Sequence, residues 1–477
     1  MSARLEQGDS GWAEREPDLN WLAKSTHSIP AVRLDDLAER NGGRWVLAAL
    51  AIAVATGLGL RVGYAADGRD YQPPDSRAYA RIAESLYEDG SFDARAAGAR
   101  REVQASSSYA PGLPLLVSAT YWLSGGVHLD LARVVLALFG AASVLLAYLL
   151  GRRLAGPVAG LLSAVALAIF PALIEYHGLL LSEPLASFLL PAGLLLTLRA
   201  RTSGGAWAWA GAGGLLGALA LVRPEYLPVA ILLPAVALLG RTDAGTRRRL
   251  LDAGLMLSAT AVVLAPWTIR NLVVFDRVVP VSTGGGKALY IGTYLDADGD
   301  GAKLRGLLLE QRPRLRERLA RAGPLDDPNR YVLERVLTKV AAGEHPGVDT
   351  DVALGRLGRE NLRTDITDHP TDFASMLLSK AYDTWTEPAR GVMDQQPWRT
   401  LQLGLLVAAL AGLAILAARR RLESLVLGAI LLYITGIGAV LIASPRRELV
   451  VLPLLTALAG AGVVWAAQRL LALRAGP

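Results

Sequence analysis

The chain has 477 residues, of which 52% are hydrophobic and only 19% are charged, with a formal net charge of +6. A soluble chain of this length carries about 25% charged residues, so the composition excludes an ordinary soluble protein. The absence of cysteine excludes disulfides and thiolate metal sites. Basic residues follow apolar runs, as in "GRR" at 151–153 and "ARRR" at 418–421, which favours membrane orientation over nucleic-acid binding.

The first 44 residues are polar, and the first apolar run begins too late for a cleaved signal peptide. We expect a cytoplasmic tail over 1–44 that is disordered or loosely helical. About 20 apolar residues cross a bilayer, and the runs that follow predict an all-α polytopic membrane protein with about ten transmembrane helices. These runs lie at 45–62, 130–150, 157–175, 179–198, 207–222, 224–240, 250–266, 399–417, 425–442 and 449–467.

The first exterior loop, at 63–129, contains the sequence "YQPPDSRAYARIAESLYEDGSF" at 71–92. After the proline pair, Asp75 stands at a position typical of a helix N-cap. Apolar residues then recur with helical spacing, which predicts an amphipathic helix lying in the membrane interface. Asp75 therefore has two interpretations, as a helix cap or as a carboxylate that acts as a general base at the membrane surface.

Residues 113–124, "LPLLVSATYWLS", are apolar but short, and they predict either an eleventh span or a second surface helix. The positive-inside rule favours the surface helix, because every short arginine-containing loop then falls on the cytoplasmic side. Both chain ends are then cytoplasmic. The arginines that decide this orientation are Arg152, Arg153, Arg199, Arg201, Arg241, Arg247, Arg248, Arg249, Arg419, Arg420 and Arg421.

This topology divides the chain into a membrane module at 45–266, a large exterior loop or helical subdomain at 267–398, and C-terminal helices at 399–477. The subdomain contains "YLDADGDG" at 294–301, which begins like a calcium loop with Asp296, Asp298 and Asp300. Leu307 stands where such a loop needs a bidentate carboxylate, so an Asp/Gly-rich turn is the favoured interpretation. "STGGGK" at 282–287 lacks the spacing of a P-loop but is suited to a flexible loop that contacts substrate.

Several charged residues fall at the exterior ends of the predicted spans, where polar groups near the membrane are costly. Arginines gathered on one membrane face are suited to bind a phosphate through forked hydrogen bonds. The alternative is that these side chains only reach from the helix ends into the interface. The residues are Glu183, Arg223, Glu225, Arg270, Arg446 and Arg447.

Read in order, these stretches resemble the GT-C superfamily of membrane glycosyltransferases, and in particular glycosyltransferase family 39. That family includes protein O-mannosyltransferase-like and aminoarabinose transferase-like enzymes. The resemblance covers roughly residues 45–465. It is carried by "PPDSRAYARIAESLYEDGSF", "YAPGLPLLVSATYWLSG", "LLLSEPLASFLL", "ALVRPEYLP", "APWTIRNLVVFDRVVPVSTGGGKALYIGT" and "PRRELVVLPLLTALAG".

The resemblance implies a GT-C bundle with surface helices in the first exterior loop and a polyprenyl-phosphate sugar as donor. It implies a multi-pass protein of a bacterial-type cytoplasmic membrane that acts on the outer face, with inversion at the sugar carbon. Asp75 matches the catalytic acid of the family. Many relatives have an Asp-Glu pair there, whereas Ser76 follows here, which makes Asp70 the fallback.

The resemblance also implies a basic residue against the lipid phosphate near the last span, where Arg446 or Arg447 matches. With Arg223, Arg270 and Lys287 these arginines form the expected donor-phosphate site. The candidate pocket residues are Tyr79, Glu183 and Glu225. No cofactor is expected to be required, and the acceptor is a protein, lipid or glycan.

Two other functional classes are compatible with such a chain. A lipid-linked sugar flippase would show internal repeats or broken helices with charges near mid-span, whereas the charges here gather at one face. A non-catalytic scaffold would not need an acid and an arginine cluster that converge. The favoured hypothesis is a glycosyltransferase that works at the membrane.

Overall fold

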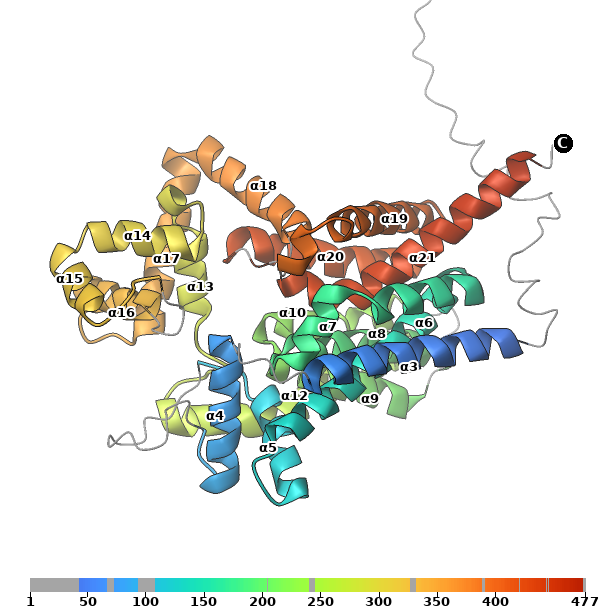
Figure 1. Ribbon diagram of the computed structural model, residues 1–477, viewed down its shortest axis with the longest axis horizontal. Coiled ribbons are helices and arrows are strands. Elements are labelled where there is room, and N and C mark those ends of the chain that lie inside the picture. Colours follow the sequence, from blue (N-terminus) through green and yellow to red (C-terminus); the bar gives the residue numbers. More distant parts are fainter. Residues whose placement is uncertain are drawn as a thin grey trace, which may run out of the picture.

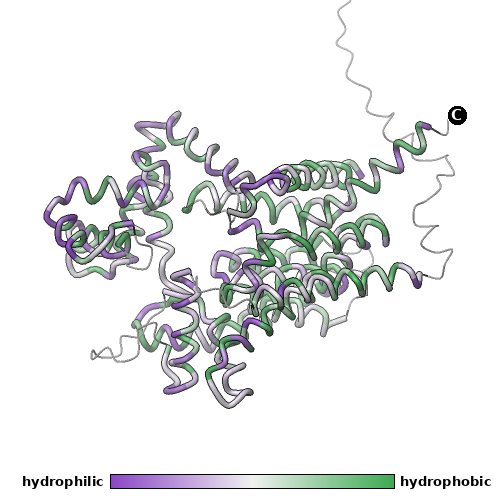
Figure 2. Tube along the Cα trace, in the orientation of Figure 1, coloured by the Kyte–Doolittle hydropathy of each residue, from purple (hydrophilic) through white to green (hydrophobic). Residues whose placement is uncertain are grey.

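The structure is a computed structural model that describes residues 43–66, 73–92, 108–203, 205–239, 245–326, 332–387, 391–419, 421–442, 444 and 446–474. Every regular element in this part of the chain is a helix, arranged as an apolar bundle with a polar subdomain beyond one end (Figures 1 and 2). The predicted all-helical membrane fold is confirmed.

Within the described residues, seven helices are long and apolar enough to cross a membrane. They are α3 (Arg44–Ala66), α6 (Leu129–Ala168), α8 (Glu183–Ser203), α12 (Thr246–Phe275), α19 (Trp398–Ala418), α20 (Leu422–Val440) and α21 (Arg446–Arg474). Shorter apolar helices follow α8, namely α9 (Ala206–Val222) and the series η1 (Pro224–Tyr226), α10 (Leu227–Leu232) and α11 (Ala235–Leu238). The expected total of ten spans stays a prediction.

α6 is a helical hairpin and not one straight helix of 40 residues. Gly156 has a φ of 89° and precedes Pro157, so the backbone leaves the helical conformation there. The two halves then pack so closely that a Cβ at Gly151 would lie 2.9 Å from the Ala159 carbonyl oxygen. Two predicted runs, at 130–150 and 157–175, therefore meet within one continuous element.

The second half of α6 ends in contact with a buried arginine. Arg61 of α3 donates hydrogen bonds to the carbonyl oxygens of Leu167 and Ala168, both at 3.0 Å. These carbonyl groups belong to the last turn of the helix, where they have no hydrogen-bond donor within the helix itself. A cation is also favoured at this end by the helix dipole. The chain can then turn into α7 (Pro171–Gly178), which leads directly to the start of α8.

α21 is the most enclosed of these spans and packs against α6, α8 and α19. Its middle is rich in alanine and glycine, and small side chains let helix backbones approach closely inside a membrane. The first residues of α21 are Arg446 and Arg447, so this central helix carries two arginines to one end of the bundle.

The loop that the sequence predicts to be the first exterior one contains two helices, α4 (Pro74–Glu88) and α5 (Gly112–Ser124), which pack against each other. α4 buries Ala78, Tyr79, Ile82 and Ala83, the apolar face that the sequence predicts. Figure 1 shows α4 running across the direction of the bundle helices, as expected for a helix that lies along a membrane surface.

The subdomain has a core of its own, separate from that of the bundle. Leucine and valine side chains from its helices fill this core, among them Leu304, Leu337 and Leu354. α18 (Pro370–Thr386) and η4 (Gly391–Asp394) lead back to the bundle (Figure 1). The subdomain comprises α13 (Gly285–Gly292), η2 (Leu295–Ala297), α14 (Gly301–Glu310), α15 (Pro313–Arg321), α16 (Val332–Glu344) and α17 (Thr350–Asp368).

α4 and the subdomain stand at the same end of the bundle, whereas the start of α3 and the end of α21 lie at the opposite end (Figure 1). The residues that meet at the end of the bundle near α4 and the subdomain are therefore far from both ends of the described chain. They form the candidate site.

Candidate active site at the end of the bundle

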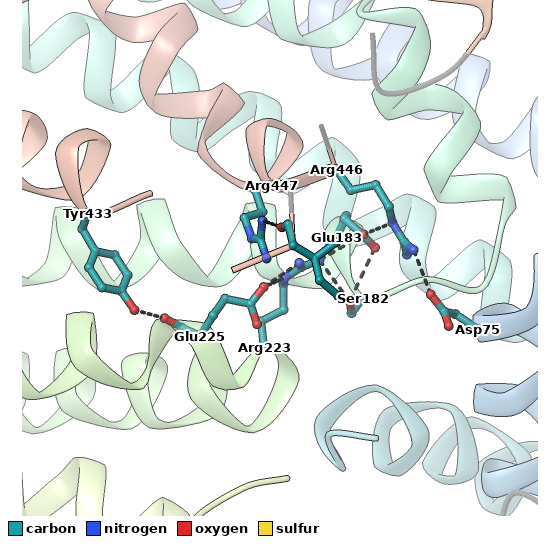
Figure 3. A network of polar contacts seen from close by, with 9 residues as sticks. Asp75, Ser182, Glu183, Arg223, Glu225, Tyr433, Arg446 and Arg447 are labelled. Atoms are coloured by element: carbon teal, nitrogen blue, oxygen red, sulfur yellow. Dashed lines mark hydrogen bonds and ion pairs between the residues drawn. The ribbon is translucent and has the colours of Figure 1, made fainter. Parts of the chain in front are cut away.

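A row of charged side chains from four separate parts of the chain meets at this end of the bundle (Figure 3). Asp75 comes from the first turn of α4, Glu183 from the start of α8, and Arg446 from the start of α21. Arg223 and Glu225 flank the junction between α9 and η1. Helix ends gather here, and their unpaired backbone groups suit a polar site.

Arg446 joins the first loop to the bundle. Its Nη1 donates to Asp75 Oδ2 at 2.8 Å, and its Nε donates to Glu183 Oε1 at 2.7 Å. Its guanidinium also lies over the ring of Tyr176, 5.7 Å from the centroid. One guanidinium therefore fixes the position of two carboxylates that are distant in the sequence.

Arg223 continues the row. Its Nη1 lies 3.0 Å from Glu183 Oε1, and its Nη2 lies 2.5 Å from Glu225 Oε1. Ser182 also accepts a hydrogen bond from Arg223, at 3.4 Å, and Tyr433 of α20 donates to the carbonyl of Glu225. The carboxylate of Glu183 is thus shared between two arginines, which offsets the cost of burying it.

Exposure separates the members of this network. The side chain of Glu183 is fully buried, whereas those of Asp75 and Arg446 are 40% and 31% exposed. Asp75 and Arg446 are therefore accessible from outside the protein, whereas the buried carboxylate of Glu183 fixes the positions of Arg446 and Arg223. Arg447 lies near Glu225 and Arg223 and donates to the carbonyl of Ile442.

Tyr79 forms the wall behind Asp75. Its ring packs edge-on against Tyr109 with centroids 5.2 Å apart, and only 9% of the residue is exposed. Burial, followed by the nearby carboxylates of Asp75 and Glu183, raises the pKa of the Tyr79 phenol above its ordinary value. Tyr79 therefore stays neutral and offers a hydroxyl group beside the network.

The structure corrects the interpretation of Asp75 as a helix cap. Pro73 occupies the N-cap position of α4, no side chain caps that end, and Asp75 lies inside the first turn. Proline suits the start of a helix, because the N–H group that it lacks would have no partner within the helix there. A carboxylate in the first turn is favoured by the helix dipole. The Asp75 oxygens are therefore available to Arg446. Asp70, the fallback base, lies outside the described residues.

Two of the predicted phosphate ligands have other surroundings. Arg270 lies among the rings of Trp267, Phe92 and Phe275, between 4.9 and 5.8 Å from their centroids. Lys287 belongs to the subdomain, where its Nζ lies 3.5 Å from Glu334 Oε1. Both residues have the right charge, but tertiary packing places them among these other partners.

The acidic turn of the subdomain has structural partners. Asp300 caps α14 by accepting from the backbone N of Lys303 at 2.7 Å, and Asp298 lies 2.6 Å from Lys303 Nζ. Asp296 belongs to the short helix η2. Among the described residues, no group of three or more His, Asp or Glu side chains could hold a metal ion.

Sequence reasoning missed three residues of the network, namely Ser182, Tyr176 and Tyr433. Ser182 precedes Glu183 in "LSEPL", so its position beside the carboxylate was a usable signal. Tyr433 was also detectable, because it is a hydroxyl-bearing side chain inside the apolar run "AILLYITG". Tyr176 contacts Arg446 only through the tertiary fold.

No protein-family model and no curated protein matches the chain. Two crystal structures of the oligosaccharyltransferase from Archaeoglobus fulgidus do match. The structure with a tethered acceptor peptide has a TM-score of 0.51 and 14% identity, and the match covers 90% of this chain and 50% of that one. The apo structure matches with a TM-score of 0.50 and 16% identity, and the match covers 90% of this chain and 51% of that one. The chain shares the fold of these oligosaccharyltransferase structures.

The chain spans about half the length of that oligosaccharyltransferase. A looser match is to ArnT from Cupriavidus metallidurans bound to undecaprenyl phosphate, with a TM-score of 0.36, 16% identity, and coverage of 89% of this chain and 78% of that one. At the level of fold, the match to the oligosaccharyltransferase agrees with the GT-C resemblance, and the narrower assignment to glycosyltransferase family 39 stays a prediction.

Proposed function

We propose that the chain is a glycosyltransferase that moves a sugar from a polyprenyl-phosphate donor to an acceptor hydroxyl at the membrane surface. The observation that carries this proposal is the ion pair between Asp75 and Arg446, two accessible side chains, in which the guanidinium is also held by buried Glu183. The pair lies at one end of an apolar bundle, which supports a lipid carrier whose phosphate lies at the membrane surface.

The chemistry needs the two groups that this pair supplies. The acceptor oxygen attacks the anomeric carbon and forms the new glycosidic bond while the bond from that carbon to the donor phosphate breaks. Asp75 takes the hydroxyl proton, and the polyprenyl phosphate leaves with one additional negative charge. Arg446, supported by Arg223 and Arg447, stabilises that charge, and the sugar carbon is inverted.

The donor phosphate and Asp75 compete for Arg446. In the structure Arg446 is paired with Asp75, at 2.8 Å. A phosphate that binds Arg446 weakens this pair and leaves the carboxylate free to accept a proton. Donor binding therefore activates the base as a direct result of the shared partner.

Metal independence and the side of the membrane belong to the same proposal. Three arginines, Arg223, Arg446 and Arg447, lie at or beside the site, which supports stabilisation of the phosphate charge without a divalent ion. We place the site on the outer face and both chain ends in the cytoplasm, following the distribution of arginines along the sequence. The oligosaccharyltransferase structure contains an acceptor peptide, so a protein acceptor is tested beside lipid and glycan acceptors.

The test is a transfer assay with purified protein, labelled polyprenyl-phosphate sugars and the three acceptor classes. Wild type is expected to transfer sugar, and Asp75→Asn to lose activity by about a hundredfold or more, as expected for removal of a general base. Asp89→Asn is the matched control, since this carboxylate ends the same helix and accepts from the backbone N of Ser91.

Two results would contradict the proposal. Full transfer by Asp75→Asn would exclude this carboxylate as the base, and donor flipping without any transfer would favour a transporter. Activity should survive EDTA. If EDTA abolishes transfer and a divalent ion restores it, only the metal-independent part of the proposal fails.

A further inference from the structure

The outer tip of the subdomain carries a second charged surface, distant from the proposed active site. α15 and the residue before it contain five arginines and one glutamate within 312–321, a formal charge of +4 (five minus one). Three arginines of this region and one lysine of α16 line one open hollow of about 560 Å³. The basic hollow is lined by Arg312, Pro313, Arg314, Leu315, Arg318 and Lys339.

The subdomain core fixes the shape of the basic hollow. Leu319 points inward from α15 and is 5% exposed, and Val336 and Leu337 point inward from α16. Arg314 and Arg318 are four residues apart, so they lie on one face of α15, and Lys339 of α16 faces the same hollow. Packing thus fixes the helix positions from which these cations project.

The cations of the basic hollow are not neutralised by the part of the chain that the structure describes. No described carboxylate lines the hollow, and no ion pair is formed there by Arg314, Arg318 or Lys339. Acidic residues gather instead at a different hollow of about 1060 Å³, which includes Asp365 and Asp372. The hollow with most of the carboxylates is therefore a different one from the basic hollow.

We propose that the basic hollow binds a soluble polyanion with closely spaced phosphate groups, as a docking site separate from the transfer reaction. Guanidinium groups bind phosphate with two hydrogen bonds, and the volume is in the range of pockets that take more than one small anion. α15 is the part of the subdomain farthest from the bundle (Figure 1), so the fold holds the hollow away from the lipid surface that α4 marks.

Binding of labelled inorganic polyphosphate to the full chain in phosphatidylcholine nanodiscs tests this proposal. Wild type is expected to bind, with an affinity that falls as salt is raised. The triple variant Arg314→Gln, Arg318→Gln and Lys339→Gln is expected to lose affinity by about tenfold or more, because three contacts are removed.

The matched control removes three positive charges outside the hollow, through Arg316→Gln, Arg321→Gln and Arg335→Gln. Its affinity is expected to stay within about threefold of wild type. All six positions are exposed, so both variants should keep the wild-type melting temperature.

Three outcomes would overturn the proposal. The first is an equal loss of affinity in both triple variants, which would indicate general charge attraction. The second is no binding by wild type at physiological salt. The third is loss of polyphosphate binding in nanodiscs that contain anionic lipid, which would assign the hollow to membrane headgroups. None of these outcomes bears on transfer at Asp75, because neither variant touches the network of Arg446.

Discussion

Arg446 shows how one residue acquires its role from its neighbours. In the sequence it is one of two adjacent arginines before an apolar run, and nothing local distinguishes it from Arg447. In the structure Arg446 bridges Asp75 and Glu183, whereas Arg447 donates to a backbone carbonyl. Arg446 is therefore the arginine that a phosphate entering from solvent would meet first.

The substitution Arg446→Lys is expected to raise the KM for donor by about tenfold or more. A lysine has a single charged nitrogen at the end of a flexible stem and cannot hold two carboxylates and a phosphate in fixed geometry. Steady-state kinetics with varied donor measures this effect. Arg270→Lys is the control, because Arg270 lies among aromatic rings, and an equal rise in KM there would contradict our placement of the phosphate.

The candidate residues themselves were largely predictable from the sequence. Glu183, Arg223 and Arg446 each stood out as a charge beside an apolar run, where charge is costly, and Asp75 stood out after the proline pair that begins an amphipathic helix. The structure brings these four together and leaves Arg270 and Lys287 among other partners. The sequence could not separate these two groups, because a charge beside an apolar run does not specify the direction in which its side chain points.

At the scale of elements, the hairpin of α6 depends on close backbone contact. A Cβ at Gly151 would lie 2.4 Å from Ser163 Oγ and 3.1 Å from the Cα of Gly160. These atoms include backbone, which cannot rotate away as a long side chain can. The two halves would therefore have to separate to admit even a methyl group.

Gly151→Ala is expected to lower the free energy of unfolding by about 1–3 kcal/mol, the usual cost of overpacking. Gly254→Ala in α12 is the matched control, because a Cβ added there would have no other atom within 4 Å and alanine favours a helix. Thermal unfolding in detergent measures both variants. Equal stability of the two would contradict the close packing of the hairpin.

α18 is joined to the subdomain by a buried lysine. Lys380 is 3% exposed, and its Nζ donates to the carbonyl oxygen of Gly292 at 2.6 Å. Burial, with a smaller contribution from Arg447, lowers the pKa of the Lys380 ammonium group to about 8. In the unfolded chain this pKa is about 10.4.

This difference predicts a pH dependence with a definite sign. Above about pH 8 the folded chain loses the Lys380 proton while the unfolded chain keeps it, so stability rises with pH. From about pH 7.5 to 9.5 wild type should gain about 2 kcal/mol relative to Lys380→Met. Unfolding of both proteins across this range measures the difference. A constant difference would show that Lys380 does not titrate here.

At the scale of the whole molecule, the fold separates the proposed site from both ends of the described chain (Figure 1). The polar subdomain and α4 stand at one end of the bundle, and the end of α21 stands at the other. If the bundle crosses the membrane along its helices, the subdomain and the end of α21 are on opposite sides.

Because the chain has no cysteine, single cysteines can report this sidedness. Ala320→Cys in α15 should react with a membrane-impermeant maleimide in intact cells, and Arg474→Cys at the end of α21 only after permeabilisation. Both positions are exposed, so access depends on the membrane alone. Labelling of Arg474→Cys in intact cells would reverse the proposed orientation.

The sequence by itself determined the class of the fold, because long apolar runs have few alternatives to membrane helices and amphipathic spacing predicts a surface helix. It also identified most of the charged residues that meet in the network, since charge is costly beside lipid. Only the tertiary structure decided which of these charges meet, that Arg446 pairs with Asp75, and that the arginines of α15 line a hollow of their own. Contacts between residues hundreds of positions apart depend on how helices pack, and helix packing is set by shape over the whole bundle.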